Sequence, residues 1–385
     1  MKIRNVVEDE VVKKSVKFQA LQNAYNNLLK QYTTLRTNKV SLDALESERK
    51  AIFLKDELRT RDKKYEVALN RIAALEHTIN TLLPLTKYKP QLITINKSPN
   101  LTETEAVAIG LLSDVHCASK VEPKSVNFLN EYNPVICKKR LSQFFKGFLR
   151  LVEIQRHGVI INEALLYFLG DFIHGYIHEE YKKSNFMSPS KEIIFLFDIL
   201  ISGLTYLKEH GKFKHITIIC QEGNHGRTTD KIEISTAYEN SFEWILYQFL
   251  ARHFEKDKII KFIIPESILY EYVVFNKTIR SLHGHEINYH GGVGGLDVPL
   301  RKALGQWDKG TYADYTFLAH WHTFKVDENF VVNGSVIGQD AYSIRIKADY
   351  RPPQQAFVLI DNKRGKTIAC PIFLDRDMRT FKTRG

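Results

Sequence analysis

Aspartate, asparagine and histidine recur in this chain directly after runs of apolar residues. Asp114 and His116 stand two positions apart in "LLSDVHC", so an extended backbone places both side chains on the same side. Asn224 and His225 are adjacent in "IICQEGNHGR", where glycines flank them. Carboxylate, amide and imidazole donors in this mixture suit Mn, Fe or Zn ions. These residues therefore indicate a metal centre, in which the amide of Asn224 would ligate a cation without adding charge.

Three more segments repeat the pattern. They are "YFLGDFIHG" with Asp171 and His174, "RSLHGHE" with His283 and His285, and "TFLAHWHTF" with His320 and His322. Each segment is unremarkable by itself, but five apolar segments in succession end in a carboxylate, an amide or an imidazole. Ligand sites of α/β sheets assemble at the carboxyl ends of strands. Seven such ligands with one shared carboxylate would hold two cations roughly 3.5–4 Å apart.

The elements that must position these residues follow from the alternation of apolar and amphipathic segments after residue 105. We expect strands over 106–112, 165–169 and 216–220, and helices over 135–155, 193–207 and 238–254. Mostly strands follow, with hairpins that turn at Asn276-Lys277 and around residues 361–365. This order of elements predicts an α/β fold.

The first 83 residues differ, since positions 8–83 contain neither proline nor glycine. Apolar residues there follow the three-and-four spacing of a coiled-coil seam. The first seam comprises Phe18, Leu21, Tyr25, Leu28, Tyr32, Leu35 and Leu42, and the second comprises Leu58, Tyr65, Leu69, Ile72, Ile79 and Leu83. The break between the seams allows one long helix with a stutter or a helical hairpin that turns near residues 43–56.

This helical coiled-coil arm, residues 1–83, needs a partner surface. We expect a homo-oligomer formed through the N-terminal helices; the alternative is that the arm packs on the remainder of its own chain. Pro84 is expected to end the helix, and residues 84–104 read as a linker to a domain that spans 105–385.

Composition limits the class of protein. The 385 residues are 44% hydrophobic and 26% charged, as in globular proteins, and no apolar run is long enough to predict a membrane span. The N-terminus lacks the apolar core of a secretory signal, and four scattered cysteines indicate a reducing compartment, so we expect a cytoplasmic protein. The net charge is +11, and residues 1–95 hold 18 lysines and arginines against 11 acidic residues. This balance favours a polyanionic partner such as nucleic acid.

In this order, Asp-x-His, Gly-Asp, Gly-Asn-His, His-Gly and His-x-His resemble the calcineurin-like metallophosphoesterase superfamily. The resemblance covers roughly residues 106–340 and includes Asn333-Gly334-Ser335, which is similar to the segment after the family's last histidine pair. It implies a two-sheet α/β sandwich flanked by helices, with the metals at one edge. Ala319 stands where the family usually has a glycine, a change that we expect to be tolerated.

The resemblance also implies a role for each candidate ligand. Asp171 would bridge two metal ions. The first ion would be held by Asp114, His116 and His322, and the second by Asn224, His283 and His320, with His285 as the alternative to His283. We expect two divalent ions, with Mn²⁺ preferred and Fe, Zn or Mg also compatible.

The implied reaction is hydrolysis of a phosphoester. Two cations would lower the pKa of a bridging water, whose hydroxide would attack phosphorus in line. His225 follows a ligand without being one, so it would protonate the leaving group as general acid. His174 resembles a histidine of the SbcD-type DNA-repair nuclease branch that positions the substrate phosphate; the alternative is a hydrogen bond that supports Asp171. Arg227 is a candidate phosphate clamp.

The sequence thus predicts a dinuclear-metal phosphodiesterase that acts on nucleic acid. Two features depart from the SbcD-type branch: a helical arm precedes the Asp-x-His motif, and about 60 residues follow His322, so no large capping domain is expected. One alternative is a phosphatase or phosphodiesterase that acts on a small nucleotide or a phosphoprotein. Another is a coiled-coil scaffold with an inactive metallo-domain, against which the filled ligand positions argue.

Overall fold

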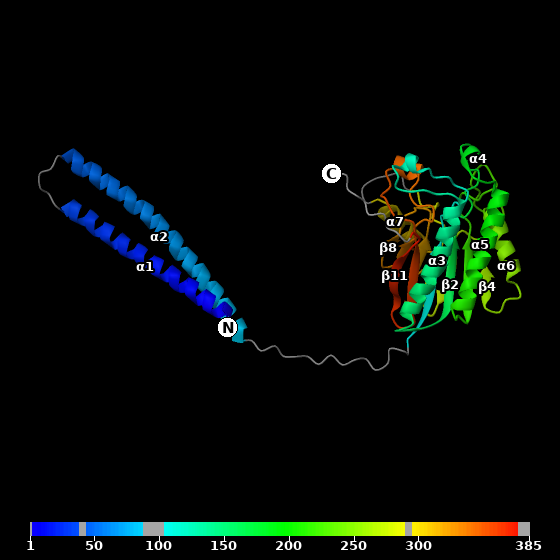
Figure 1. Cartoon of the computed structure of the whole chain (residues 1–385), viewed down its shortest axis with the longest axis horizontal. Helices are drawn as coiled ribbons and strands as arrows, with labels where there is room; N and C mark the ends of the chain where they lie inside the picture. Colours follow the sequence, from blue (N-terminus) through cyan, green and yellow to red (C-terminus); the bar gives the residue numbers. More distant parts are fainter. Residues whose placement is uncertain (1, 38–43, 88–103, 289–294, 376–385) are drawn as a thin grey trace. The chain divides into compact units, whose positions relative to one another are not determined.

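A computed structural model of the chain describes residues 2–37, 44–87, 104–288 and 295–375. The chain divides into two compact units, Met1–Lys97 and Ser98–Gly385, and Figure 1 draws both of them. Within the described residues, no helix combines the length and the apolar character needed to cross a lipid bilayer.

The first unit contains two helices, α1 (Lys2–Thr37) and α2 (Ala44–Lys87), which lie side by side and run in opposite directions (Figure 1). The rings of Phe18 and Tyr25 stack on Tyr65, with ring centroids 5.6 and 5.8 Å apart. Both predicted seams therefore contribute to the contact between the helices. Of the two alternatives that the sequence left open, the structure adopts the hairpin.

Two predicted boundaries of this unit differ from the structure. The turn predicted near residues 43–56 is wrong, because α2 is helical from Ala44 onward. The helix also continues past Pro84 to Lys87. A proline so close to a helix end removes only one backbone hydrogen bond and leaves the earlier turns intact. Most of the predicted linker, residues 88–103, lies outside the described residues.

Two β-sheets form the second unit. The six-stranded sheet has the order β11 (Gly365–Phe373), β10 (Gln354–Asp361), β1 (Glu105–Leu112), β2 (Ile160–Leu169), β3 (His215–Gln221) and β4 (Ile260–Ile263). Strands β1 to β4 are parallel, and β10 and β11 add an antiparallel hairpin. The five-stranded sheet has the order β5 (Tyr270–Val274), β6 (Lys277–Ser281), β7 (Tyr315–Leu318), β9 (Phe330–Val332) and β8 (Lys325–Val326). Both hairpins that the sequence predicts are present, as β5–β6 and β10–β11.

Helices cover both outer faces of this pair of sheets. The six-stranded sheet is covered by α3 (Pro134–Gln155), α5 (Pro189–His210) and α6 (Phe242–His253), and the five-stranded sheet by α7 (Asp297–Trp307). Three short helical segments lie in loops: η2 (Pro123–Val126), α4 (Tyr181–Ser184) and α8 (Ala341–Arg345). The predicted fold class, a two-sheet α/β sandwich flanked by helices and preceded by N-terminal helices, is confirmed.

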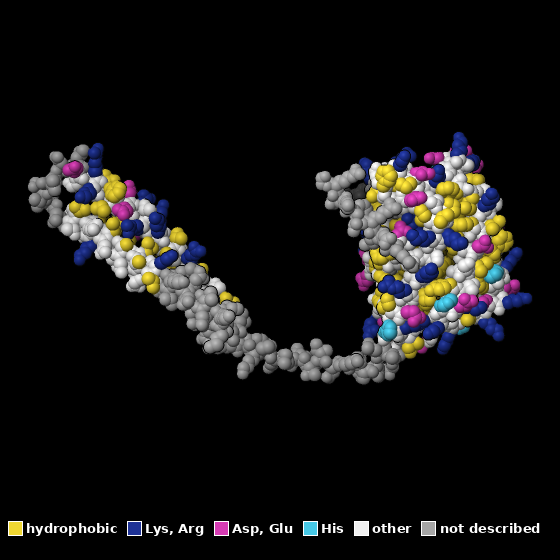
Figure 2. All heavy atoms as spheres, viewed as in Figure 1, with side chains coloured by type: hydrophobic (Ala, Val, Ile, Leu, Met, Phe, Trp, Pro, Cys, Tyr) yellow, Lys and Arg dark blue, Asp and Glu magenta, His cyan; other side chains and the backbone are white. Residues whose placement is uncertain are grey.

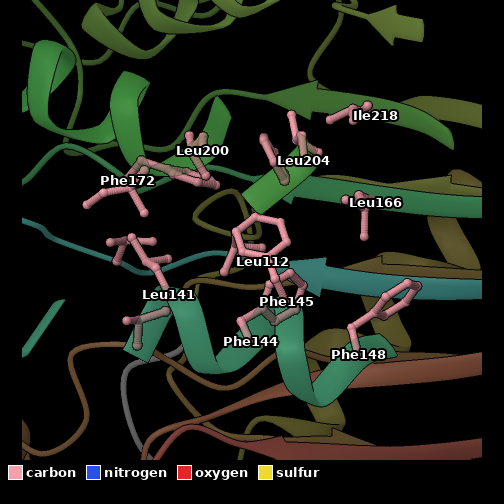
Figure 3. Packing of buried hydrophobic residues seen from close by; sticks show 14 of the residues in the cluster. Leu112, Leu141, Phe144, Phe145, Phe148, Leu166, Phe172, Leu200, Leu204 and Ile218 are labelled. Carbon is pink, nitrogen blue, oxygen red and sulfur yellow. The ribbon is translucent and has the colours of Figure 1, made fainter. Parts of the chain in front are cut away.

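Side chains along the central strands point alternately to the two faces of the six-stranded sheet. Each of these strands therefore packs against the helices on one face and against the other sheet on the other. In β1, Ala106 and Ala108 belong to the cluster beneath the helices, whereas Val107, Ile109 and Leu111 belong to the cluster between the sheets. Figure 3 shows the helix side, where phenylalanines of α3 meet leucines of β1, β2 and α5. Because the central strands are buried on both faces, they read in the sequence as continuous apolar runs.

The contact between α3 and α5 is close enough to require a glycine. A Cβ atom at Gly203 would lie 2.1 Å from Cε2 of Phe145, whose side chain is fully buried. We expect Gly203→Ala to lower the free energy of unfolding by about 1–3 kcal/mol, because the ring must leave its preferred position. Urea denaturation measures this change. The control is Gly305→Ala on α7, where nothing lies within 4 Å of the new Cβ and stability should not fall.

Candidate metal centre

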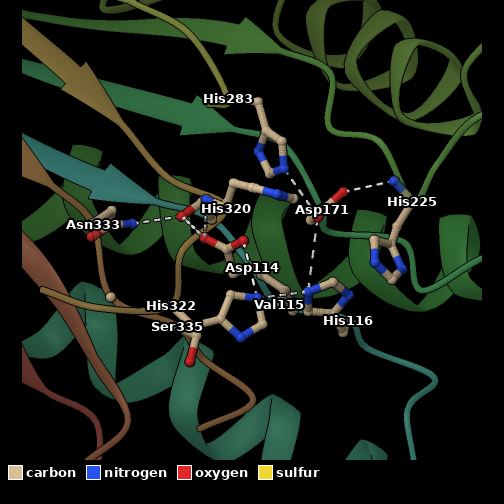
Figure 4. A network of polar contacts seen from close by, with 12 residues as sticks. Asp114, Val115, His116, Asp171, His225, His283, His320, His322, Asn333 and Ser335 are labelled. Carbon is tan, nitrogen blue, oxygen red and sulfur yellow. Dashed lines mark hydrogen bonds and ion pairs between the residues drawn. The ribbon is translucent and has the colours of Figure 1, made fainter. Parts of the chain in front are cut away.

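The candidate residues lie where five strands end, at the same end of the two sheets. They follow β1 (Asp114, His116), β2 (Asp171, His174), β3 (Asn224, His225), β6 (His283) and β7 (His320, His322). Figure 4 shows that side chains from both sheets point toward one another. The fold therefore brings together all seven predicted ligands and both predicted catalytic histidines.

One donor set consists of Asp114, His116 and His322, whose ligand atoms all lie within 4.8 Å of one another. Nε2 of His322 is 3.3 Å from Oδ1 of Asp114 and 3.2 Å from Nε2 of His116. Three donor atoms this close together suit a single ion, whose bonds to such donors are about 2 Å long. This is the set that the family resemblance implies for the first metal.

A second donor set consists of Asp171, Asn224, His283 and His320. Nε2 of His283 lies 3.0 Å from Oδ2 of Asp171 and 3.2 Å from Oδ1 of Asn224. His320 adds a ring nitrogen within 4.8 Å of the donors of Asp171 and His283. Oδ2 of Asp171 is also 4.0 Å from Nε2 of His116, so this carboxylate lies between the two sets, where a bridging ligand is predicted.

The hydrogen bonds around His283 show that the second set suits a cation. Nδ1 of His283 lies 2.6 Å from the carbonyl oxygen of Leu169, which can only accept, so Nδ1 carries a proton and donates it. In the neutral ring, Nε2 is then an acceptor that faces two more acceptors, the oxygens of Asp171 and Asn224. In the first set, Oδ1 of Asp114 is buried and has no hydrogen-bond partner of acceptable geometry among the described residues. The residues present therefore fit bound divalent cations.

The titrating groups of the site respond to burial and to one another. Burial favours the neutral form of Asp171, but the neighbouring imidazoles, His283 first, hold its pKa well below its usual range. Burial opposes the charge on His283, yet Asp171 raises the pKa of this imidazole to about 10. Burial and neighbouring imidazoles hold the pKa values of His116 and His320 well below the usual value. The positive charge that Asp171 draws onto His283 is the charge that a bound cation would supply.

Five of the predicted ligands have a left-handed backbone. Their φ angles are 51° at Asp114, 46° at His116, 55° at Asp171, 71° at His320 and 51° at His322. Such angles cost on the order of 1–3 kcal/mol for residues other than glycine, and they concentrate at functional sites. This shared strain indicates that the strand ends are shaped to aim these side chains.

Hydrogen bonds between neighbouring loops hold the strained strand ends. The N–H of His116 donates to the carbonyl oxygen of Asp171 at 2.9 Å. Oγ of Ser113 donates to Oδ2 of Asp114 at 2.6 Å and accepts from Nδ2 of Asn333 at 2.7 Å. The Asn-Gly-Ser segment that the sequence singles out thus supports a ligand. Ser113 carried no signal in the sequence, because one hydroxyl at a strand end is ordinary.

His174 and His225 contact different parts of the site. Nδ1 of His174 lies 3.2 Å from Nδ1 of His116, so His174 orients the ring of a predicted ligand. Within the described residues it makes no hydrogen bond to Asp171, because the turn after β2 carries it toward the loop of His116. Nδ1 of His225 lies 3.1 Å from the carbonyl oxygen of His174, and its backbone N–H donates to Oδ1 of Asp171 at 2.8 Å. Burial lowers the pKa of His225.

A cleft of about 250 Å³ adjoins both donor sets, and His174 and His225 line it. Tyr181 forms part of its wall, with ring centroids 4.2 Å from His174 and 6.0 Å from His225. Tyr342 and Arg351 also line the cleft. The sequence offered no signal for these three residues, since each lies in a loop or a short helix without an apolar pattern.

Arg227 and His285 are not among the residues that line this cleft; both adjoin a smaller cavity. Nη1 of Arg227 donates to the carbonyl oxygen of Asn224 at 2.7 Å, and Nε donates to that of Thr229 at 3.2 Å. The guanidinium thus holds the turn of its own loop, and the predicted phosphate clamp stays a prediction. His283 is the residue whose ring contacts Asp171, whereas the centroid of His285 lies 5.5 Å from that of His283.

The chain is similar to known proteins in structure but not in sequence. No protein-family model and no curated protein sequence matches the chain. Hypothetical protein PH1004 from Pyrococcus horikoshii OT3 is 13% identical, with a TM-score of 0.34, over 70% of this chain and 89% of that one. Vacuolar protein sorting 29 from Cryptosporidium parvum is 13% identical, with a TM-score of 0.27, over 69% and 97% of the two chains. Wild-type Vps29 from Entamoeba histolytica, solved with Zn²⁺, is 14% identical, with a TM-score of 0.24, over 44% and 89%.

Proposed function

We propose that the second unit is a phosphoesterase of the calcineurin-like class that hydrolyses phosphodiester bonds in nucleic acid with two divalent ions, Mn²⁺ preferred. The observation that carries this proposal is the pair of donor sets that share Asp171 beside a cleft. The order of the motifs along the chain supports the class, and His174 in "GDFIHG" supports the SbcD-type branch.

The residues of the chain divide the work of the reaction. Two divalent cations, when bound, supply hydroxide from water near neutral pH and neutralise charge on the phosphate oxygens. Asp171 lies between the two donor sets, with Oδ2 3.0 Å from Nε2 of His283 and 4.0 Å from Nε2 of His116. His174 fixes the ring of His116 through their Nδ1 atoms. Nδ1 of His225 forms a hydrogen bond with the carbonyl oxygen of His174. Nε2 is therefore the atom that would pass a proton to the leaving alkoxide.

Two observations support nucleic acid as the substrate class. The chain carries a net charge of +11, which favours association with a polyanion. Tyr181 and Tyr342 line the cleft next to the donor sets, and aromatic rings stack on nucleobases irrespective of sequence. A strand that enters this cleft would present a phosphate to the metals and a base to a tyrosine.

A small phosphoester is the second candidate substrate. The cleft is also lined by Asp340 and Asp349, and Arg351 makes an ion pair with Asp349 at 3.5 Å. Carboxylates beside the site repel the further phosphates of a long strand, but they do not hinder a substrate with one phosphate. This feature favours a cyclic nucleotide or a phosphorylated peptide over duplex nucleic acid.

Parallel assays with Mn²⁺ test the proposal. The protein is offered single-stranded DNA, duplex DNA, RNA, cyclic nucleotides and a phosphopeptide at low and high salt. Binding of nucleic acid should weaken steeply with salt, because each phosphate contact releases counterions. Turnover of cyclic nucleotides alone would favour the second candidate. A protein that binds Mn²⁺ but hydrolyses none of these substrates would support the inactive scaffold.

We also propose that the helices of the first unit join two copies of the chain. The outward side of α2 carries Phe53, Val67, Leu75 and Leu82, whose side chains are 69%, 66%, 37% and 52% exposed. Their spacing places them on one side of a helix with 3.6 residues per turn. Figure 2 shows hydrophobic atoms on the surface of these helices. Only Leu54 and Leu58 are buried apolar residues in the described part of this unit, which is a small core for a hairpin.

Light scattering should therefore give a mass near twice the 44.6 kDa of one chain. The double variant Phe53→Ser and Val67→Ser is expected to shift the protein to the monomer, because it removes two large apolar groups from the proposed interface. The control is Val135→Ser, which changes a residue of the second unit that is 79% exposed and should leave the mass unchanged. A wild-type chain that stays monomeric at high concentration would contradict the proposal.

A further inference from the structure

Two fully buried glutamates lie behind the loops of the metal centre. Glu192 belongs to α5 and Glu243 to α6, and both side chains are 0% exposed. A buried carboxylate costs several kcal/mol unless hydrogen bonds replace the lost water. The groups that satisfy these two carboxylates therefore indicate what each of them does.

Both oxygens of Glu243 accept hydrogen bonds from the backbone of the site loops. Oε1 accepts from the N–H of Phe172 at 2.5 Å and from that of Ile173 at 3.2 Å. Oε2 accepts from the N–H of Gly223 at 2.7 Å. Phe172 directly follows Asp171, and Gly223 directly precedes Asn224. One carboxylate thus spans the two loops that supply the oxygen ligands of the second donor set.

The glycines around Asn224 make this span possible. A Cβ at Gly223 would lie 2.2 Å from Oδ1 of Asp171, so no larger residue lets the two loops approach. A Cβ at Gly226 would lie 2.8 Å from Cγ of Glu243. The start of α6 adds a further link, because the N–H of Phe242 donates to the carbonyl oxygen of Gly226 at 2.8 Å. Glycine therefore occurs on both sides of the Asn-His pair, because the loop after β2 lies against Gly223 and α6 lies against Gly226.

Glu192 performs a parallel task on the neighbouring loops. Its Oε2 accepts from the N–H of His174 at 2.7 Å and from Sγ of Cys117 at 3.2 Å. Oε1 accepts from the N–H of Gly175 at 3.2 Å. Glu192 thus joins the loop of His174 to the loop after β1. Within the described residues, the loop that supplies Asn224 makes no such contact with Glu192. The two glutamates therefore hold different pairs of loops.

We propose that Glu243 is a positioning residue that sets the distance between Asp171 and Asn224 and thereby the affinity of the second metal site. This inference rests on the proposed function, since it presumes that the two donor sets bind cations. The length of the side chain and its two acceptors are both required. Glutamine keeps one acceptor but turns an NH₂ group toward the N–H of the other loop, and aspartate is one methylene too short to reach both loops.

A metal titration of Glu243→Gln tests this role without any assay of activity. Calorimetry with Mn²⁺ should find two sites in the wild-type protein. In the variant we expect one site to weaken by about 10–100-fold, as when other groups that support metal ligands are removed. The other site, formed with Asp114, His116 and His322, should keep its affinity. If Glu243→Gln does not fold, Glu243→Asp takes its place with the same expected shift.

The matched control is Tyr247→Phe, one turn further along α6. Its hydroxyl is buried and donates to the carbonyl oxygen of Gln221 at 3.2 Å, so the variant also loses a buried hydrogen bond between α6 and β3. Tyr247→Phe should lower the melting temperature and leave both metal affinities unchanged. If Glu243→Gln behaves in the same way, Glu243 only stabilises the fold and the inference is wrong. If the wild-type protein binds no metal, the proposed function falls as well.

Discussion

Asp171→Asn is expected to abolish turnover of phosphodiesters and to release bound metal from both sites. Oδ2 of Asp171 lies 3.0 Å from a ring nitrogen of the second donor set and 4.0 Å from one of the first, so its charge serves both sets. Asparagine has the same shape and tolerates the φ angle of 55° at this position, so the fold should persist. We expect the rate to fall at least ~10³-fold. Loss of a ligand should weaken metal binding by more than about 100-fold, the upper value for supporting residues.

Metal content after dialysis, together with the Mn²⁺-dependent rate, measures the effect of Asp171→Asn. The matched control is Asp361→Asn, which changes another buried carboxylate of the same sheet. Oδ1 of Asp361 accepts from the N–H of Lys363 at 2.9 Å in a hairpin turn, and Asp361 pairs with Ala106 at the other end of β1. This control should lose stability but keep its metal. If Asp171→Asn retained two ions with undiminished affinity, the shared-carboxylate arrangement would be refuted.

His225→Ala is expected to slow hydrolysis by an amount that depends on the leaving group. Nε2 of His225 is the ring nitrogen that remains when Nδ1 bonds to the carbonyl oxygen of His174. A general acid contributes about 10²–10⁴-fold when the leaving group is an alkoxide that needs a proton. We therefore expect a loss of that size for a dinucleotide. Bis-(p-nitrophenyl) phosphate should be cleaved at nearly the wild-type rate, because p-nitrophenolate is stable as an anion.

The control for this leaving-group test is His178→Ala. His178 also lines the cleft, but it is exposed and belongs to neither donor set. Its loss should change the rates of both substrates to the same small extent. Metal content must be measured in each variant, because the backbone N–H of His225 also bonds to Asp171. Equal losses with both substrates in His225→Ala would remove the general-acid assignment and leave His225 as a structural residue.

Much of the fold was readable because its central strands are buried on both faces. Continuous apolar runs such as that of β1 predict a buried strand, and the observed bounds, Glu105–Leu112, differ by one residue from those predicted. The strand β2 begins at Ile160, five residues earlier than expected, because the polar pair Asn162-Glu163 interrupts its apolar run. In the arm, the turn was misplaced because helix propensity remains high across residues 44–56 and only the tertiary contact between the two helices selects the break.

The candidate ligands were also readable, but the residues that hold them were not. Asp114 and Asn224 stand at strand ends, where their types already suggest a site. Glu243 lies in the first turn of α6, a position where acidic residues are common for local reasons. Its contacts with the loops of Asp171 and Asn224 depend on how α6 packs on the sheet. For Arg227, by contrast, the sequence suggested a site residue because its charge stands close to a predicted ligand. In the structure its guanidinium donates hydrogen bonds to carbonyl groups of its own loop.

The sequence by itself determined which chemical groups this protein offers and that each would stand at the end of a strand, because strand periodicity and turn residues are local properties of the chain. Only the tertiary structure decided which of those groups meet. His322 Nε2 and Asp114 Oδ1 come within 3.3 Å of each other although they follow strands of different sheets, β7 and β1. That meeting results from the order of the strands and the packing of one sheet on the other. Both are set by the burial of apolar surface between residues far apart in the chain, which no local pattern records.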